Sequence, residues 1–202
     1  MRLVPWWAFF SSGCAPALLV AGWAIAALLE GSAYDSATQT ISVLAACGAA
    51  GFWVMTAALL AVGVCHLLTA WGLRAAAFAG RMALAGGGVS ALAVVVVPAA
   101  TSRGDLRHGS VAVVGFTLLA VWPLLAAHRD GAAPWGLRPT PSLLASALMG
   151  MGAVWFLFEV RQQGTIGVAE RLVTFMQSLW PFVVVVSCLR HPAQRRLTAE
   201  RT

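Results

Sequence analysis

Three acidic residues lie near the ends of apolar segments, where a carboxyl group could do chemistry on an apolar molecule. Asp35 follows the first apolar segment, Glu159 lies at the end of the fifth, and Glu170 precedes the sixth. A carboxylic acid that an apolar site keeps protonated can protonate an alkene or an epoxide and so start a cyclisation or isomerisation. The alternative is structural, because Arg161 or Arg171 could simply neutralise Glu159 and Glu170.

Aromatic and polar residues accompany the acids and could form the walls of a substrate site. A carbocation produced by protonation needs aromatic faces and protection from water. Trp23 and Phe52 could supply such faces, although tryptophan in a membrane protein also anchors at the lipid–water interface. The side chains that we expect to contact a substrate are Tyr34, Trp53, His108, Trp155, Phe156, Arg161, Arg171 and Trp180.

Two histidines extend this chemistry. His108 lies at the start of an apolar segment, where it could shuttle protons near neutral pH or simply be hydrogen-bonded at a helix start. His66 is the one ionisable residue deep inside an apolar segment. It could line the same cavity or hydrogen-bond a neighbouring helix.

The residue pattern gives no support for metal or nucleotide chemistry. The chain has no DDxxD-like acidic cluster that would bind Mg²⁺ and pyrophosphate, and no glycine-rich nucleotide loop. Its four cysteines lack the CxxC or histidine-flanked spacing that is typical of zinc sites. We therefore expect no metal and no cofactor.

Membrane-spanning helices must position these residues. Hydrophobic residues make up 60% of the 202 residues and charged residues 10%, against about 25% charged in a soluble domain. A spanning helix needs about 20 apolar residues, and its backbone groups must bond within the segment. The sequence therefore predicts one all-α transmembrane bundle over residues 1–202, with spans at 6–29, 51–73, 82–100, 111–127, 142–160 and 172–189 and a basic tail at 190–202.

Small residues give these helices a way to pack. Gly86 to Gly88, Gly150 with Gly152, and Gly48 with Gly51 would allow close approach where hydrophobicity cannot drive association. The same residues could pair two copies of the chain, so a homo-oligomer stays an open alternative.

The distribution of arginines predicts the orientation of the bundle in the membrane. An even number of spans puts both termini on one side, and nine arginines fall on that side against four on the other. Both termini are therefore expected in the cytoplasm. Five of the seven acids fall on the outer side, which the positive-inside rule does not require. Because the arginines lie singly or in pairs at segment ends, we expect no nucleic-acid binding.

The first outer loop, residues 30–50, is too long for a simple turn and is rich in apolar and β-branched residues. Asp35 or Ser36 could cap a short helix in it, with Ile41 and Leu44 facing lipid or the bundle. We expect a short re-entrant or interfacial helix here. A solvated surface loop is the alternative.

Several short segments, taken in order, resemble a known family. They are Tyr34-Asp35-x5-Ile41-Ser42, Trp53-Val54-Met55-Thr56-Ala57, His108-Gly109 and Glu170-Arg171-Leu172. Together they make the chain similar, over nearly its whole length, to the bacterial membrane family called domain of unknown function 998 (DUF998). The resemblance implies a compact multi-helix fold in the bacterial plasma membrane and says little about activity.

Two functions from different classes fit the sequence. The first is an enzyme that uses general acid catalysis, without a metal, to cyclise or isomerise a lipophilic isoprenoid or meroterpenoid; small membrane terpene cyclases resemble the chain in architecture only. The second is a non-catalytic protein that binds lipid, assists transport or serves in a stress response. Membrane lipid and a lipophilic small molecule are the expected partners. Convergence of Asp35, Glu159 and Glu170 on one aromatic-walled cavity would favour the enzyme.

Overall fold

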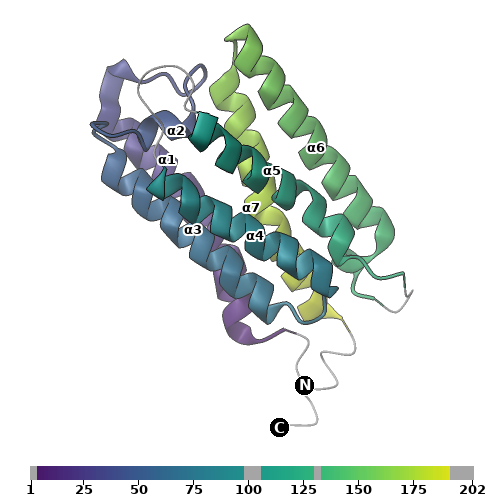
Figure 1. Ribbon diagram of the computed structural model, residues 1–202. Coiled ribbons are helices and arrows are strands. Elements are labelled where there is room, and N and C mark those ends of the chain that lie inside the picture. Colours follow the sequence, from purple (N-terminus) through teal and green to yellow (C-terminus); the bar gives the residue numbers. More distant parts are fainter. Residues whose placement is uncertain (1–3, 98–105, 130–132, 192–202) are drawn as a thin grey trace.

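Six long helices run back and forth through one bundle (Figure 1). The computed structural model describes residues 4–97, 106–129 and 133–191. Each long helix is long and apolar enough to cross a membrane. The predicted six-span all-α bundle is therefore confirmed, and the chain is a multi-pass membrane protein. The helices are α1 (Trp6–Glu30), α3 (Phe52–Gly72), α4 (Phe78–Val96), α5 (Leu106–Ala126), α6 (Pro139–Gln162) and α7 (Ile166–Arg190).

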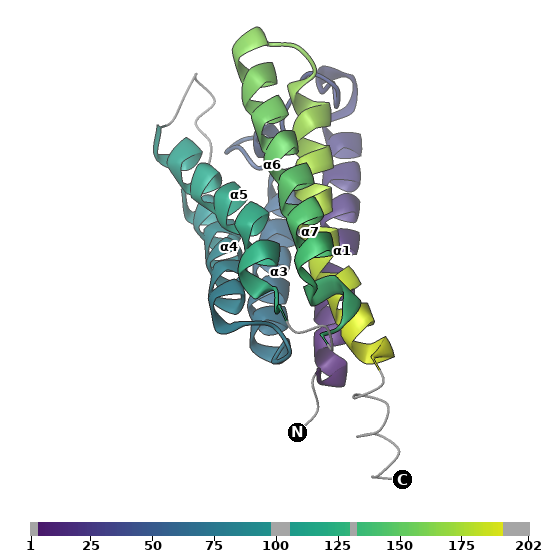
Figure 2. The same ribbon diagram turned by 90° about the vertical axis from the view of Figure 1, so that its right-hand side faces the viewer.

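The long helices form a closed ring. Each packs against the next in the chain, and α7 returns to pack against α1. The helix α6 is the least buried span; it runs along the right-hand side of the bundle in Figure 1 and lies in front in Figure 2. The end of the bundle where α1 begins and α7 ends is called the terminal end below, and the opposite end is called the loop end.

Three short helical elements connect the spans: η1 (Gly31–Ala33), α2 (Ile41–Leu44) and η2 (Trp135–Leu137). The short helix predicted in the first loop is present as α2. Ile41 and Leu44 are both buried and pack into the bundle with Leu19 and Met55. The first loop therefore folds back into the helices.

The helix α4 begins at Phe78, four residues before the predicted start of the third span, and Arg81 explains the difference. From inside α4, its Nε donates to the Ala70 carbonyl oxygen (2.8 Å) and its Nη2 to that of Trp71 (3.2 Å). The arginine thus satisfies carbonyl groups that the end of α3 leaves free. Arg81 therefore caps the preceding helix and is not part of a connecting loop.

A close backbone contact near the site joins α3 and α4 at Gly63 and Gly88. A Cβ atom on Gly63 would lie 2.9 Å from the Gly88 carbonyl oxygen, and one on Gly88 would lie 2.8 Å from that of Gly63. Only glycine lets the two backbones touch in this way. The contact brings the adjoining turns of α3 and α4 to the interior of the ring.

The buried core divides into two clusters with different positions along the bundle. The cluster at the terminal end includes Val4, Ala8, Leu73, Leu84, Trp122, Leu137 and Val184. The cluster nearer the loop end comprises Leu19, Ala26, Ile41, Leu44, Met55, Ala58 and Val62.

Candidate functional site

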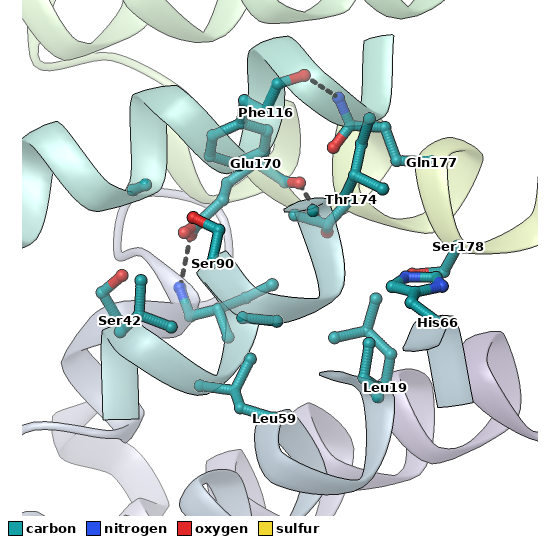
Figure 3. A pocket seen from close by; sticks show the side chains of 18 of the residues that line it. Leu19, Ser42, Leu59, His66, Ser90, Phe116, Glu170, Thr174, Gln177 and Ser178 are labelled. Carbon is teal, nitrogen blue, oxygen red and sulfur yellow. Dashed lines mark hydrogen bonds between the residues drawn. The ribbon is translucent and has the colours of Figure 1, made fainter. Parts of the chain in front are cut away.

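A cavity of about 120 Å³ lies inside the ring, lined by α1, α2, α3, α4, α5 and α7 (Figure 3). Because one buried water needs about 10–15 Å³ of such space, the cavity has room for something much larger than water. None of its described lining residues comes from α6. Its walls are mostly apolar and include Leu19, Leu59, Val62, Phe116 and Leu119.

Glu170 forms the polar end of the cavity nearer the loop end. The side chain is only 6% exposed, although it carries a carboxyl group. Its Oε2 accepts a hydrogen bond from the backbone N–H of Ile41 at 2.5 Å, which ties α2 to α7. The Ser42 side chain also interacts with this carboxyl group. A carboxyl group loses its hydration inside the bundle, so its burial costs free energy unless hydrogen-bond partners such as these replace the water.

His108 extends the same polar end toward α5. Its Nδ1 lies 2.7 Å from the Val97 carbonyl oxygen, and because a carbonyl only accepts, Nδ1 carries the hydrogen. In the neutral ring Nε2 is then the acceptor, and it faces the Ser42 hydroxyl at 3.2 Å. Ser42 therefore connects His108 with Glu170.

His66 lines the cavity from α3, on the same helix face as Leu59 and Val62. It is 1% exposed. Neither of its ring nitrogens has a hydrogen-bond partner among the residues that the structure describes. In the view of Figure 3 it lies toward the same side of the pocket as Ser178, with Glu170 toward the other side. The cavity thus has polar side chains on two opposite sides.

A polar stripe on α7 runs along the cavity. Glu170, Thr174, Gln177 and Ser178 follow the spacing of one helix face and all line the cavity. Gln177 Nε2 donates to the carbonyl oxygen of Phe116 on α5, at 3.0 Å. Sequence reasoning missed Thr174, Gln177 and Ser178, although their spacing from Glu170 was a readable signal.

Arg171 holds the first loop against the start of α7. Its Nη1 donates to the carbonyl oxygens of Ser36 (2.8 Å), Gln39 (3.1 Å) and, within its own helix, Gly167 (2.9 Å). Its Nη2 donates to the Tyr34 hydroxyl. The contacts between residues 34–40 and the first two turns of α7 are called the loop dock below.

Gly167 is the position in α7 where the loop dock is tightest. The backbone N–H groups of Gly167 and Val168 both donate to the Ala37 carbonyl oxygen, at 3.0 and 3.3 Å. A Cβ atom on Gly167 would overlap the carbonyl oxygens of Ser36 and Gln39. The loop can therefore lie this close to α7 only because the residue is glycine.

Tyr34 and Asp35 are bonded within the loop. Burial raises the pKa of Tyr34 above its ordinary 10.0, and its hydroxyl donates to the Thr40 carbonyl oxygen at 3.0 Å. The Ala37 N–H (3.0 Å) and the Thr38 hydroxyl (2.7 Å) hold the pKa of Asp35 below 3.8. The stability that Asp35 contributes is therefore present above pH 3.8 and is lost as the pH falls through the lower pKa that this residue has in the folded protein.

Glu30 and Glu159, two further acids at the loop end, cap helices and do not line the cavity. Glu30 Oε1 accepts the N–H of Gly51 before α3, at 2.9 Å. Glu159 Oε2 accepts the N–H of Thr165 before α7 at 2.6 Å, and Oε1 accepts the Trp155 indole N–H at 3.0 Å. Because α3, α5 and α7 all begin at this end, their free N–H groups and positive dipole ends collect there. Helix capping thus gives a physical reason for the acids on this side.

Replacing Glu159 with alanine should lower the free energy of unfolding by about 1 kcal/mol, because α7 loses an N-terminal cap. The cavity itself should not change, since Glu159 does not line it. Chemical unfolding in detergent measures the loss of stability, and hydrogen exchange of the Ile41 amide, which Glu170 holds at the cavity, should stay as in the natural chain. A stability equal to that of the natural chain would contradict this assignment.

Of the predicted site residues, Glu170 and His108 line the cavity, whereas Tyr34 and Arg171 belong to the loop dock. The three acids do not meet on one cavity, since Asp35 is exposed on the loop and Glu159 caps α7.

None of the aromatic residues expected around a substrate is among the described residues that line the cavity. Trp53 is 78% exposed on α3. Trp180 packs against Trp135, with ring centroids 6.0 Å apart. Phe156, on α6, packs against Phe116, with ring centroids 5.6 Å apart, and Trp155 donates to Glu159. Arg161, which was also expected at the site, is exposed.

Comparison with known proteins identifies the family of the chain. No curated protein and no solved structure matches the chain. A family model described as a protein of unknown function (DUF998) matches residues 14–187. Of the segments on which the resemblance rests, those with Ser42, His108 and Glu170 meet at the loop end of the cavity. Because the match spans most of its length, the chain belongs to the DUF998 family.

Proposed function

We propose that the chain binds one lipophilic small molecule in the cavity between the α4–α5 hairpin and α7. One observation carries the proposal: a largely apolar cavity inside the bundle has the buried Glu170 carboxyl group in its wall. Small-molecule sites typically combine apolar walls with a few polar groups that orient the ligand. Glu170, Ser42 and His108 would receive the polar group of the molecule, and the apolar walls its body.

The location of the site belongs to the same proposal. We place the protein in the bacterial plasma membrane with both termini in the cytoplasm, because arginines outnumber acids at the terminal end. Glu170 would then lie in the outer half of the bilayer, and the ligand would come from the membrane itself.

A matched pair of substitutions tests the binding site. Ala112 lines the cavity on α5, whereas Ala57 is exposed on the outer face of α3. With decanol that carries a photoreactive diazirine, we expect labelled peptides from the cavity walls in the natural chain and in Ala57→Phe. The label should be lost in Ala112→Phe, whose ring fills the cavity.

The unfolding midpoint of each variant controls for misfolding. If a folded Ala112→Phe protein is labelled on the cavity walls as strongly as the natural chain, the proposal is wrong. It is also wrong if the natural chain takes no label there.

A second candidate function is acid catalysis on the bound molecule, which the burial of Glu170 in an apolar cavity favours. The carboxyl group of Glu170 would give its proton to an alkene carbon or an epoxide oxygen. The resulting cation would form a new carbon–carbon bond or shift a double bond, with the Phe116 ring nearby. Loss of a proton to the carboxylate would restore the acid, so the product would have the mass of the substrate.

Product analysis tests this second candidate. Cells that express the chain would be given epoxidised isoprenoids and searched for products of unchanged mass. We expect such a product from the natural chain, from Asp35→Asn and from Glu159→Gln, and none from Glu170→Gln. A product that persists in Glu170→Gln would rule out acid catalysis by this residue, while the binding proposal would stand on its own labelling result.

A further inference from the structure

His66 is a buried polar side chain that the described part of the chain leaves unsatisfied. It is 1% exposed, it lines the cavity, and both ring nitrogens lack a hydrogen-bond partner among the described residues. Buried polar groups in folded proteins are nearly always hydrogen-bonded, since an unmade bond costs free energy. A neutral imidazole offers one donor and one acceptor, so this side chain can bind a hydroxyl or carbonyl group.

The position of His66 is opposite to that of Glu170. Figure 3 shows Glu170 and Ser42 toward one side of the pocket, with His66 and Ser178 toward the other. Glu170 and Ser178 are separated by two turns of α7, which is about 12 Å at 1.5 Å per residue. Both α3 and α7 begin at the loop end, so His66 and Ser178 both lie deeper in the bundle than Glu170.

Between the two polar sides, the walls that α1, α3 and α5 supply are apolar, while Thr174 and Gln177 on the α7 side donate to backbone carbonyl oxygens of the protein itself. The apolar walls are formed by Leu19 on α1, Leu59 and Val62 on α3, and Phe116 and Leu119 on α5. A hydrocarbon segment can pack against such a wall without burying a polar group. A molecule with one polar group could satisfy the Glu170 side or His66, but not both.

We infer that the cavity takes an elongated molecule with an apolar middle and a hydroxyl or carbonyl group at each end. Its outer group binds Glu170 and Ser42, and its inner group binds His66. This inference rests on the proposed function, because it names the class of molecule that the same cavity holds.

Decanediol with a hydroxyl at each end, decanol and decane form a matched set of probes. Each would compete with photoreactive decanol for labelling of the cavity walls of the full chain in lipid nanodiscs. For the natural chain we expect decanediol to compete about tenfold better than decanol, which is the value of one additional buried hydrogen bond. Decane should compete least.

Substitution of His66 tests whether this side chain binds the inner polar group of the probe. In His66→Leu the advantage of decanediol over decanol should fall to about one, while decanol itself still competes. His66→Gln, which keeps a donor and an acceptor, should retain part of the advantage. Because both probes are compared within each variant, a general loss of folded protein cancels from the ratio.

The outcomes separate this inference from the proposed function. If no probe reduces labelling of the cavity walls, the binding proposal fails and the inference fails with it. If decanol and decanediol compete equally in the natural chain, the cavity binds lipophilic molecules but His66 does not hold a second polar group. An advantage of decanediol that survives in His66→Leu would also overturn the inference.

Discussion

Replacing Gly167 with alanine should release the first loop and lower the free energy of unfolding by about 3 kcal/mol. The added Cβ atom would overlap the carbonyl oxygens of Ser36 and Gln39, and both oxygens belong to backbone that is bonded elsewhere. The loop must then move away, which breaks the two hydrogen bonds from α7 to the Ala37 carbonyl oxygen. Unfolding in detergent measures the loss of stability.

Hydrogen exchange identifies where the protection is lost. We expect faster exchange in residues 34–44, including the Ile41 amide that Glu170 holds in the natural chain. Gly150→Ala is the matched control, since a Cβ atom there would meet nothing within 4 Å. It should raise stability slightly, because alanine favours a helix more than glycine does. Equal effects of the two substitutions would show that the loop dock does not depend on Gly167.

Replacing Arg171 with leucine should cost about 3 kcal/mol as well, through lost hydrogen bonds instead of overlap. Its guanidinium group donates to Ser36 and Gln39 in the loop and also to the Tyr34 hydroxyl. A hydrogen bond from a charged donor contributes about 1.5 kcal/mol or more, and the loop carbonyl groups would be left without this partner. The same unfolding and exchange measurements apply.

Two further variants sharpen the test of Arg171. Arg171→Lys keeps the charge but not the planar fork, so it should recover only part of the stability. Arg161→Leu removes an exposed arginine on α6 and should change stability by less than about 0.5 kcal/mol. A lysine variant as stable as the natural chain would mean that charge alone holds the loop.

Gly167→Ala and Arg171→Leu act on one contact, so their effects should not add. Once the loop has left α7, the second substitution has little more to remove, and the double variant should lose about as much as either single one. A double variant that loses the sum of both effects would mean that the two residues stabilise different parts of the protein.

The fold could be predicted well because its signals are local. Apolar runs of spanning length and the need to satisfy backbone groups in lipid fix six helices without any knowledge of their contacts. The start of α4 was harder to predict, because a charged residue such as Arg81 before an apolar segment indicates the end of a loop. Its side chain instead folds back onto α3, a contact between two helices that composition does not encode.

The site was only partly predictable, and the acids show why. Asp35, Glu159 and Glu170 look alike in the sequence, as acids beside apolar segments. What separates them is which N–H groups and walls the folded chain brings near: a loop turn for Asp35, the start of α7 for Glu159, and the cavity for Glu170. The sequence places His66 deep in an apolar segment, but its lack of a partner among the described residues is a property of the packed bundle.

The distribution of tryptophan determines what fluorescence can report on this protein. Trp6, Trp7, Trp71 and Trp135 lie where helices begin or end at the terminal end, and no described residue lining the cavity is a tryptophan. Others, including Trp53 and Trp155, lie at the loop end, so intrinsic emission will report on both ends of the bundle and will be nearly silent to a molecule in the cavity. Trp23, 5.9 Å from the Arg171 guanidinium, is the natural reporter of the loop dock. A tryptophan placed at Phe116 would add an optical signal at the cavity wall.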